Sequence, residues 1–524
     1  MKDASSEIPP TEEHPPVFPD RVWWKSPELR KLNFCVLSLL LLSSSSGFDG
    51  SLVNGLEDLD SWVSFMGHPT TTWLGSINAI YWIGGFVSTS LAAWICNIYG
   101  RKIGIYMGVT LLLAGTILGT AAPNGNAYLG SRVLVGCGFG WIGSSAPLLL
   151  NEIAWPPHRG VSSALFMVGY YVGAVISSWA TFATRTYTTS WAWRLPTLLQ
   201  FLCPLIAIPG VLFVPESPRW LISQGRVEEA RQVLANLHAN NDTTSPFITY
   251  EVLDIQGAIT AEKEAASSTG YADMFKTPGN RRRLFITVTL GLFAQWSGNG
   301  VVSYYLAMVL DTVGITNTRD QLLISACLQV WNVIFATIGA SSVERFGRRK
   351  LFGTSAVVML ASYIIITGLS RSFDKTGSAG IGTAVIPFLF VYFAGYDIVL
   401  TPMLTAYPCE IWPFGLRSRG LNILWLSSIS ATIFNTFANP IALGAIGWKY
   451  YIVFVVVLCF YAIIPYFFYP ETRGYSLEHV ARIFDGEDAV GPSGKEVLDC
   501  VVREGGEGEE EEEKAGSVAQ VERV

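Results

Sequence analysis

Hydrophobic residues along the chain come in blocks of about twenty, separated by short polar stretches. Coiled as a helix at 1.5 Å per residue, such a block spans the ~30 Å hydrocarbon core of a bilayer. The first group of blocks covers residues 33–53, 73–96, 103–122, 128–150, 161–184 and 193–214, and the second covers 284–310, 321–342, 351–370, 381–409, 418–441 and 449–469. The pattern predicts an all-α membrane protein with twelve transmembrane helices in two six-helix halves.

The polar stretches divide the chain into five parts. We expect a cytosolic N-terminal tail, a first six-helix half, a cytosolic linker, a second half and a cytosolic acidic tail, over residues 1–32, 33–214, 215–283, 284–470 and 471–524. In the linker, residues 226–240 place their apolar side chains on one helical face, which predicts short amphipathic helices under the bundle. The row of glutamates at 509–513 predicts a solvated, disordered tail.

Lys and Arg are distributed unevenly among the loops. Cytoplasmic loops carry an excess of these residues. None occurs between Lys31 and Arg101, where the loop at 57–60 carries acidic residues instead, whereas basic clusters at 345–350 and 417–419 follow even-numbered helices. We therefore expect both termini on the cytosolic side.

Composition excludes several classes of protein. Half of the 524 residues are hydrophobic and only 15% are charged, against roughly a quarter charged in a soluble domain. The net charge is −6, with the acidic excess in the tails, so no basic surface is expected to bind nucleic acid. The eight cysteines are scattered singly, without CxxC or Cys/His clusters, so neither a disulfide framework nor a metal site is expected.

No enzyme signature and no cleaved leader are apparent. The sequence contains neither a catalytic constellation nor a cofactor loop, so we expect no enzyme and no cofactor. The first 32 residues are polar and rich in proline, without the apolar core of a signal peptide. We expect the first hydrophobic helix to act as its own insertion signal.

Short motifs recur between the two groups of helices. Gly-Arg-Lys at 100–102 returns as Gly-Arg-Arg at 347–349, Asn-Glu-Ile at 151–153 as Cys-Glu-Ile at 409–411, and Pro-Glu-Ser at 215–217 as Pro-Glu-Thr at 470–472. Two homologous halves with a site between them, near the bilayer midplane, are the plan of secondary transporters.

The motifs resemble those of the sugar porter family of the major facilitator superfamily, from about residue 33 to 485. The matching segments are Gly47 to Gly50, Gly100 to Lys102, Arg132 with Gly136 and Gly138, Pro147 to Gly160, Pro215 to Trp220, Gln295 to Tyr305, Glu344 to Arg349, Glu410 to Arg417, and Pro470 to Gly474. Within the family, the sequence looks most like the fungal branch of lactose-permease-like and cellodextrin-type carriers, judging from Gln295 to Gly300, Tyr396 to Pro402 and Asn439 to Ala442. The resemblance implies sugar:proton symport across the plasma membrane by alternating access, driven by the proton gradient.

Asp49 is the strongest single candidate for a functional residue inside the membrane. A carboxylate inside a spanning helix costs ~2.5–3.5 kcal/mol, so it should face a partner or a watery cavity. The resemblance implies that Arg132, on the fourth helix, is that partner and that the pair couples transport to the proton. A static ion pair that only fixes helix packing is the alternative.

The resemblance also implies a sugar site between the halves. Amides suit sugar hydroxyls, because each hydroxyl needs both a donor and an acceptor. The positions carried over are Gln295, Asn299, Tyr304 and Tyr305 on the seventh helix and Asn332 on the eighth. An amide that only joins two helices, worth ~0.6 kcal/mol, is the alternative.

Asp397, inside an apolar run of the tenth helix, is a further candidate. It can serve as a hydroxyl ligand or second proton site, or it can be a carboxylate satisfied by nearby backbone. Met167 stands where the family has an amide, and Thr405 stands where hexose carriers have a tryptophan. Large hexose-contacting groups are thus replaced by smaller or apolar ones, and the extra room favours a disaccharide over a hexose.

Charged residues at the cytosolic helix ends form a candidate gate. We expect pairing across the halves among Arg101, Glu152, Arg159, Glu216, Glu344, Arg348, Glu410, Arg417 and Glu471. Such exposed pairs are worth only ~0–1 kcal/mol each, which suits a lock that opens in every cycle. Some of these charges can instead simply set membrane topology, and Asn97 stands where the motif usually has Asp.

Other functions stay open at this point. A sugar sensor with a transporter fold and little flux would share every motif, and so would a carrier of a polyol, quinate or another glycoside. The expected partners are a small-molecule sugar, a proton and the lipid bilayer, and the expected state is a monomer. The sequence does not identify the sugar or the role of the acidic tail.

Overall fold

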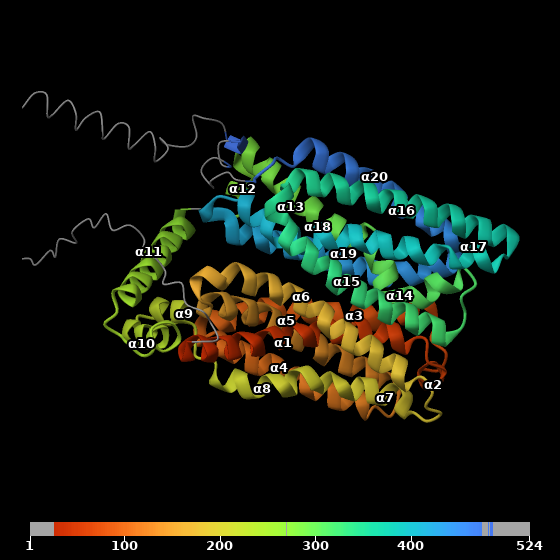
Figure 1. Ribbon diagram of the computed structural model, residues 1–524, viewed down its shortest axis with the longest axis horizontal. Helices are drawn as coiled ribbons and strands as arrows, with labels where there is room; N and C mark the ends of the chain where they lie inside the picture. Colours follow the sequence, from red (N-terminus) through yellow and green to blue (C-terminus); the bar gives the residue numbers. More distant parts are fainter. Residues whose placement is uncertain (1–25, 269, 474–479, 481–482, 486–524) are drawn as a thin grey trace, which may run out of the picture.

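The computed structural model describes residues 26–268, 270–473, 480 and 483–485 (Figure 1). Within these ranges the side chains of a few residues, Glu344 among them, are outside the description. The predicted tail at 1–25 and the glutamate row at 509–513 lie outside the described residues, so the structure does not test those predictions.

The first half contains five long helices and a sixth, divided one. The long helices are α1 (Pro27–Leu56), α3 (Thr71–Tyr99), α4 (Arg101–Thr120), α5 (Gly125–Ile153) and α6 (Arg159–Thr184). The sixth pass is made by α7 (Trp191–Leu198), the 3₁₀ turn η2 (Leu199–Phe201) and α8 (Leu202–Phe213). A short α2 (Asp60–Phe65) follows α1, and the turn η1 (Pro156–His158) joins α5 to α6.

The second half repeats this arrangement. Its passes are α13 (Pro278–Trp296) continued by α14 (Asn299–Asp311), then α15 (Thr318–Phe346), α16 (Arg348–Thr376), α18 (Val385–Ile411), α19 (Phe414–Ile446) and α20 (Tyr451–Phe468). The short α17 (Ala379–Thr383) precedes α18, and η3 (Gly447–Tyr450) joins α19 to α20.

Four helices form the linker between the halves. They are α9 (Pro218–Ser223), α10 (Val227–His238), α11 (Pro246–Ser268) and α12 (Asp273–Lys276), and they lie together at one end of the bundle (Figure 1). We call this the linker end and the opposite end, where α2 and α17 lie, the far end. The predicted amphipathic helix at 226–240 matches α10, whose buried face includes Ala230, Leu234 and Leu237.

The helices account for twelve membrane passes. Ten helical runs among the described residues are long and apolar enough to span a membrane. One of them, Gly415–Phe468, has 54 residues and would rise about 80 Å, so it holds two passes, α19 and α20. The seventh pass is not among these ten runs, because the left-handed Gly298, at φ 105°, divides it into the two shorter helices α13 and α14. The predicted twelve-helix all-α fold is therefore observed.

Helix ends extend beyond the hydrophobic blocks. α1 begins at Pro27, six residues before the predicted block at 33, and α13 begins at Pro278, within the predicted linker at 215–283. Proline is favourable at the first position of a helix, and the Thr277 side chain caps the N–H of Asn280. Hydropathy marks where a helix meets lipid and not where its hydrogen bonding begins. The division into five parts itself stays a prediction.

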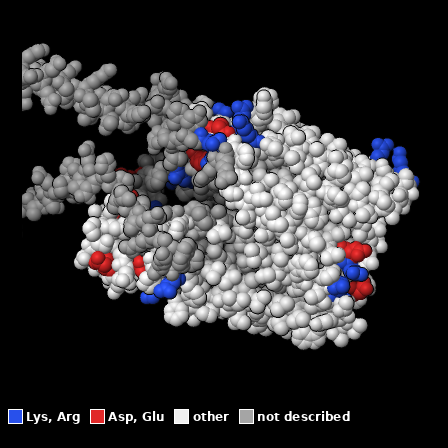
Figure 2. Space-filling view, in the orientation of Figure 1, with Lys and Arg blue, Asp and Glu red and all other residues white. Residues whose placement is uncertain are grey.

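Each half has its own hydrophobic core. One buried cluster runs from Met274 to Phe484 and belongs to the second half and its flanks, while two others belong mainly to the first half. The halves meet where α3 packs on α19, α6 on α15, and α14 on α1. A broad surface free of charged residues separates the two ends in Figure 2, as expected for a surface in contact with lipid.

Glycines allow neighbouring helices of the first half to approach closely. On α1, Gly47 lies against the carbonyl of Tyr170, and on α6, Gly173 lies against the carbonyl of Ser44. A Cβ atom at either position would overlap backbone of the other helix. Close backbone approach through small residues is a common way for membrane helices to associate, because apolar burial alone does not drive them together in lipid. This contact fixes α1, which carries Asp49, against α6.

The α1–α6 contact gives a stability prediction. Gly173→Ala should destabilise the folded protein by about 1–3 kcal/mol, the usual cost of overpacking. Gly143→Ala is the matched control, because nothing lies within 4 Å of a Cβ at this exposed helical position and alanine favours a helix. The thermal midpoint in detergent measures both. Equal midpoints for the two variants would contradict the contact.

Candidate functional site

Asp49 and Arg132 form a buried ion pair inside the first half. Arg132 Nη1 of α5 lies 2.5 Å from Asp49 Oδ1 of α1, and both side chains are at most 5% exposed. The ring of Tyr81, on α3, lies 4.8 Å from the guanidinium carbon, so the cation also rests on an aromatic face. The structure brings together the two residues that the sequence predicts as a proton-coupling pair, although the coupling role itself stays a prediction.

Gln200 is a third member of this cluster that the sequence analysis missed. It lies on η2, where its Nε2 donates to Asp49 Oδ1 at 2.6 Å and its Oε1 accepts from Thr116 Oγ1 at 3.2 Å. Asp49 Oδ2 is buried without a hydrogen-bond partner among the described residues. The available signal was a single amide in the apolar run at 193–214, but its partners lie on two other helices.

Asp397 lies in a second buried polar cluster, on α18. Tyr171 OH, on α6 of the first half, donates to Asp397 Oδ1 at 2.5 Å, and Thr401 Oγ1 donates to the same oxygen at 3.1 Å. With its amide turned to satisfy its surroundings, Asn332 donates from Nδ2 to Asp397 Oδ2 at 3.1 Å. The predicted residues Asn332 and Asp397 thus lie together, and Tyr171 joins them from the other half.

The seventh pass places two more predicted residues between the halves. Gln295 Nε2 donates to Ser428 Oγ at 3.2 Å, and its side chain is partly exposed. Tyr304 stands edge to face with Trp82 of α3, with ring centroids 6.5 Å apart. These two rings come from opposite halves, so they form an aromatic contact between the halves. The predicted residue Asn299 makes a local contact instead, since its Oδ1 accepts a hydrogen bond from Ser303 of the same helix.

Tyr305 contributes to a contact between the halves at the far end. Its backbone is non-helical (φ −138°, ψ 39°), which frees the N–H of Leu306 to donate to Asn54 Oδ1 on α1 at 3.0 Å. Asn78 Nδ2, on α3, lies 3.2 Å from Tyr305 OH and 3.1 Å from Glu57 Oε1. Tyr305 is fully buried and also donates to the carbonyl of Thr436. Its hydroxyl thus contacts Asn78 of the first half and Thr436 of the second, and its sugar contact stays a prediction.

At the linker end, two carboxylates cap two helix N-termini in the same way. Glu216 accepts from the N–H groups of Arg101 and Lys102, at 2.9 and 3.2 Å, and Glu471 accepts from those of Arg348 and Arg349, at 2.8 and 3.0 Å. Each cap follows a glycine with positive φ, Gly100 or Gly347. A Cβ there would crowd the carboxylate. This geometry explains the repeated Gly-Arg motif, because a helix N-terminus attracts an anion.

In this conformation the ion pairs of the predicted gate join residues of the same half, or join the first half to the linker. Arg101 pairs with Glu152 at 3.4 Å, and Arg348 pairs with Glu410 at 2.7 Å. Arg159 pairs with Glu251 of the linker helix α11 at 3.2 Å. None of these three pairs joins the first half to the second, contrary to the expectation from the sequence. The side chain of Glu344 lies outside the described residues, and Arg417 Nε is buried without a hydrogen-bond partner among them.

The two ends of the bundle differ in openness. The hydrogen bonds from Asn54, Asn78 and Tyr171 that join the halves lie at the far end or near the middle. At the linker end, Figure 2 shows the molecule hollowed, with charged side chains at the mouth of the hollow.

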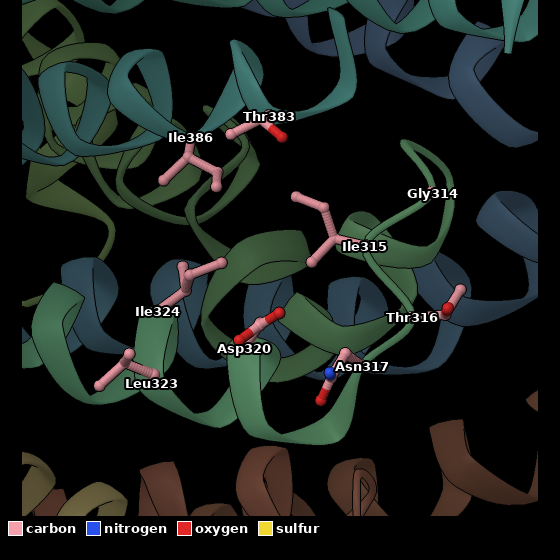
Figure 3. A pocket seen from close by; sticks show the side chains of 9 residues that line it. All are labelled: Gly314, Ile315, Thr316, Asn317, Asp320, Leu323, Ile324, Thr383 and Ile386. Atoms are coloured by element: carbon pink, nitrogen blue, oxygen red, sulfur yellow. The ribbon is translucent and has the colours of Figure 1, made fainter. Parts of the chain in front are cut away.

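A separate pocket of about 460 Å³ opens at the far end of the second half (Figure 3). It lies between the loop that follows α14, the start of α15 and the start of α18. Its lining includes Ile315, Asn317, Asp320 and Ile386. None of the predicted site residues lines it, so it is not the site between the halves.

A family model described as "Sugar (and other) transporter" matches residues 35–484. The chain belongs to this family, within the major facilitator superfamily. The MFS-type transporter oryC of Aspergillus oryzae is 30% identical over 85% of this chain and 84% of its own length. The low-affinity glucose transporter HXT1 of Saccharomyces cerevisiae is 30% identical over 78% and 72%. These relatives are transporters, so this family member is a transporter and not an enzyme.

Solved structures show the same fold. The inward-open xylose transporter XylE from E. coli has a TM-score of 0.71 at 20% identity, over 86% of this transporter and all of that chain. A structure of the proton:xylose symporter XylE with a bound bromodeoxyglucose has a TM-score of 0.70 at 21% identity, over 87% and 99%. Because the sequence identity is only about 20%, these structures support the fold of this multi-pass membrane protein and not its substrate.

Glu471 gives a prediction that depends on pH. Burial alone would raise its pKa, but four donating backbone N–H groups hold the pKa below its usual value of about 4.5. A depressed native pKa stabilises the fold above that value, and this stability is lost as the pH falls through the native pKa. Glu471→Gln, which turns an amide donor toward a backbone donor, should lower the thermal midpoint at pH 7 by about 1 °C, as a loss of ~1 kcal/mol does in a chain of this length.

The difference from wild type should shrink as the pH falls below about 4.5. Glu228→Gln is the control, because the side chain of Glu228 is 86% exposed. A Glu471 variant that behaves like this control at pH 7, or a difference that grows on acidification, would show that the caps do not stabilise the fold.

Proposed function

We propose that the transporter is a fungal plasma-membrane sugar:proton symporter that works by alternating access. The single observation that carries this proposal is the buried Asp49–Arg132 pair, a titratable contact inside a spanning helix. Intramembrane ionisable residues are retained for function, because they are costly to bury. The description of XylE as a proton:xylose symporter and of HXT1 as a glucose transporter supports the same class of substrate.

In this mechanism the proton acts through Asp49. Protonation removes the charge that attracts Arg132, and the Tyr81 ring then remains as a partner for the guanidinium. Arg132 and Gln200 donate to Oδ1, and Thr116 in turn donates to Gln200. Oδ2, which lacks a hydrogen-bond partner among the described residues, is therefore the oxygen that takes the proton. Loosening of the pair releases α1 from α5, which allows the halves to rock once sugar is bound.

The sugar binds between the halves. Gln295, Asn332 and Asp397 supply hydrogen-bonding groups from the second half, while Tyr304 and Trp82 supply aromatic faces from both. The Asn54 and Asn78 contacts seal the far end, which is the extracellular end in this proposal. In this proposal the linker end and both termini are cytosolic, so the conformation of the structure is the inward-facing one. The transporter acts as a monomer.

The substrate we propose is a disaccharide of the lactose or cellobiose type. Met167 is apolar where hexose carriers have an amide, and Thr405 is smaller than the tryptophan that they have, as the sequence analysis describes. Uptake of one labelled sugar in competition with glucose, xylose, lactose and cellobiose tests this. We expect a disaccharide to inhibit at the lowest concentration, and inhibition by glucose or xylose alone would limit the site to monosaccharides.

The coupling role gives a direct test. Asp49→Asn should abolish accumulation against a gradient in proteoliposomes with an inwardly directed proton gradient, so that internal sugar only reaches the external concentration. Sugar exchange without a gradient should persist, because the asparagine amide keeps the helix contact without a titratable charge. Asp60→Asn, at an exposed carboxylate of α2, is the control and should accumulate sugar normally. Uphill accumulation by the Asp49 variant would show that the proton couples elsewhere.

A further inference from the structure

Tyr171 forms a hydrogen bond between the halves near the middle of the bundle. It lies about midway along α6 of the first half, and Asp397 lies about midway along α18 of the second. Its hydroxyl donates to Asp397 Oδ1 at 2.5 Å and lies 3.2 Å from Thr401 Oγ1. The bond therefore crosses the space between the halves at the depth where the proposed function places the sugar.

The groups that donate to Asp397 come from both halves. Thr401 and Asn332 belong to the second half, so they move with the carboxylate. Tyr171 belongs to the first half, and its distance to Asp397 changes whenever the halves move. Of the three donors, Tyr171 alone can leave without disturbing the packing inside the second half.

The Tyr171 donor is also chemically equivalent to a sugar hydroxyl. Both are neutral O–H groups that donate to a carboxylate oxygen at about 2.5–2.8 Å. The two oxygens of Asp397 are fully buried, so a donor that leaves must be replaced or the carboxylate remains short of a hydrogen bond. A sugar hydroxyl that arrives at Oδ1 supplies that replacement.

We propose that Tyr171 is a specificity-determining residue whose hydroxyl takes the place of a sugar hydroxyl on Asp397 while the transporter is empty. This proposal rests on the proposed function, in which Asp397 contacts the sugar. Only a sugar with a hydroxyl at the matching position can displace the phenol. A sugar without it leaves the phenol in place and loses one contact.

The proposal predicts an unusual sign for the effect of a mutation. Tyr171→Phe removes the competitor and leaves the empty site one donor short, so sugar affinity should rise. A net hydrogen bond of ~1 kcal/mol corresponds to about a fivefold fall in the dissociation constant. A tyrosine that binds the sugar directly would give the opposite result, a loss of affinity on mutation.

The test is equilibrium binding to the purified full-length transporter. The probe is whichever of glucose, xylose, lactose and cellobiose competes best for uptake, together with its monodeoxy analogues. The deoxy analogue that lacks the displacing hydroxyl should bind equally well to wild type and Tyr171→Phe, whereas the parent sugar binds the variant more tightly. Tyr461→Phe is the matched control, since that hydroxyl lies 3.5 Å from Ser355 within the second half, and it should leave affinity unchanged.

The outcomes separate this proposal from the proposed function. If Asp397→Asn leaves affinity unchanged, Asp397 is not a sugar ligand and the proposed sugar site fails. If Asp397→Asn weakens binding but Tyr171→Phe binds the parent sugar with equal or lower affinity, the displacement is wrong and the sugar site stands. Tyr171→Leu, which also lacks the hydroxyl, provides the same comparison if the phenylalanine variant does not fold.

Discussion

A charged group inside a membrane must be partnered, and the arrangement of the first half follows from this requirement. Asp49 on α1 is held by Arg132 of α5 and Gln200 of η2, so three passes meet at one carboxylate. The close α1–α6 approach at Gly47 and Gly173 sets the position of that carboxylate. Because such a pair depends on charge, a single proton changes the interaction that holds these helices together. Helix packing and the proposed proton coupling therefore involve the same atoms.

The two halves use one solution twice at the linker end. Glu216 and Glu471 each cap the helix that follows a left-handed glycine, and an arginine of that helix pairs with the glutamate of a neighbouring one. These contacts join helices within each half. The side-chain hydrogen bonds between the halves at Asn54 and Asn78 lie toward the far end, and that of Tyr171 lies near the middle. Helices joined within each half are what rocking of one half against the other requires.

The sequence predicted the helices and the two halves, because hydropathy and repeated motifs are local signals. Asp49 stood out as an isolated charge, and the family resemblance supplied Arg132 as its partner. The break at Gly298 and the kink at Tyr305 were not predicted, since they depend on tertiary contacts. Gly298 lies against Tyr363 of α16, and the kink at Tyr305 is hydrogen-bonded to α1 and α19. Gln200 and Tyr171 were missed because their partners are distant in the chain. The prediction that gate residues pair across the halves took no account of conformation. In the structure, the linker end is hollowed and the pairs of Arg101 and Arg348 each lie within one half.

The central claim is that sugar and proton move together through a site between the halves. The most direct measurement loads proteoliposomes of the purified transporter with sugar, sets equal pH on both sides, and follows internal pH with a trapped dye. If the account is right, outward sugar flow carries protons out and the interior becomes alkaline. Sugar efflux with no change in internal pH would show that transport is not coupled to protons, and Asp49–Arg132 would then be a structural pair only.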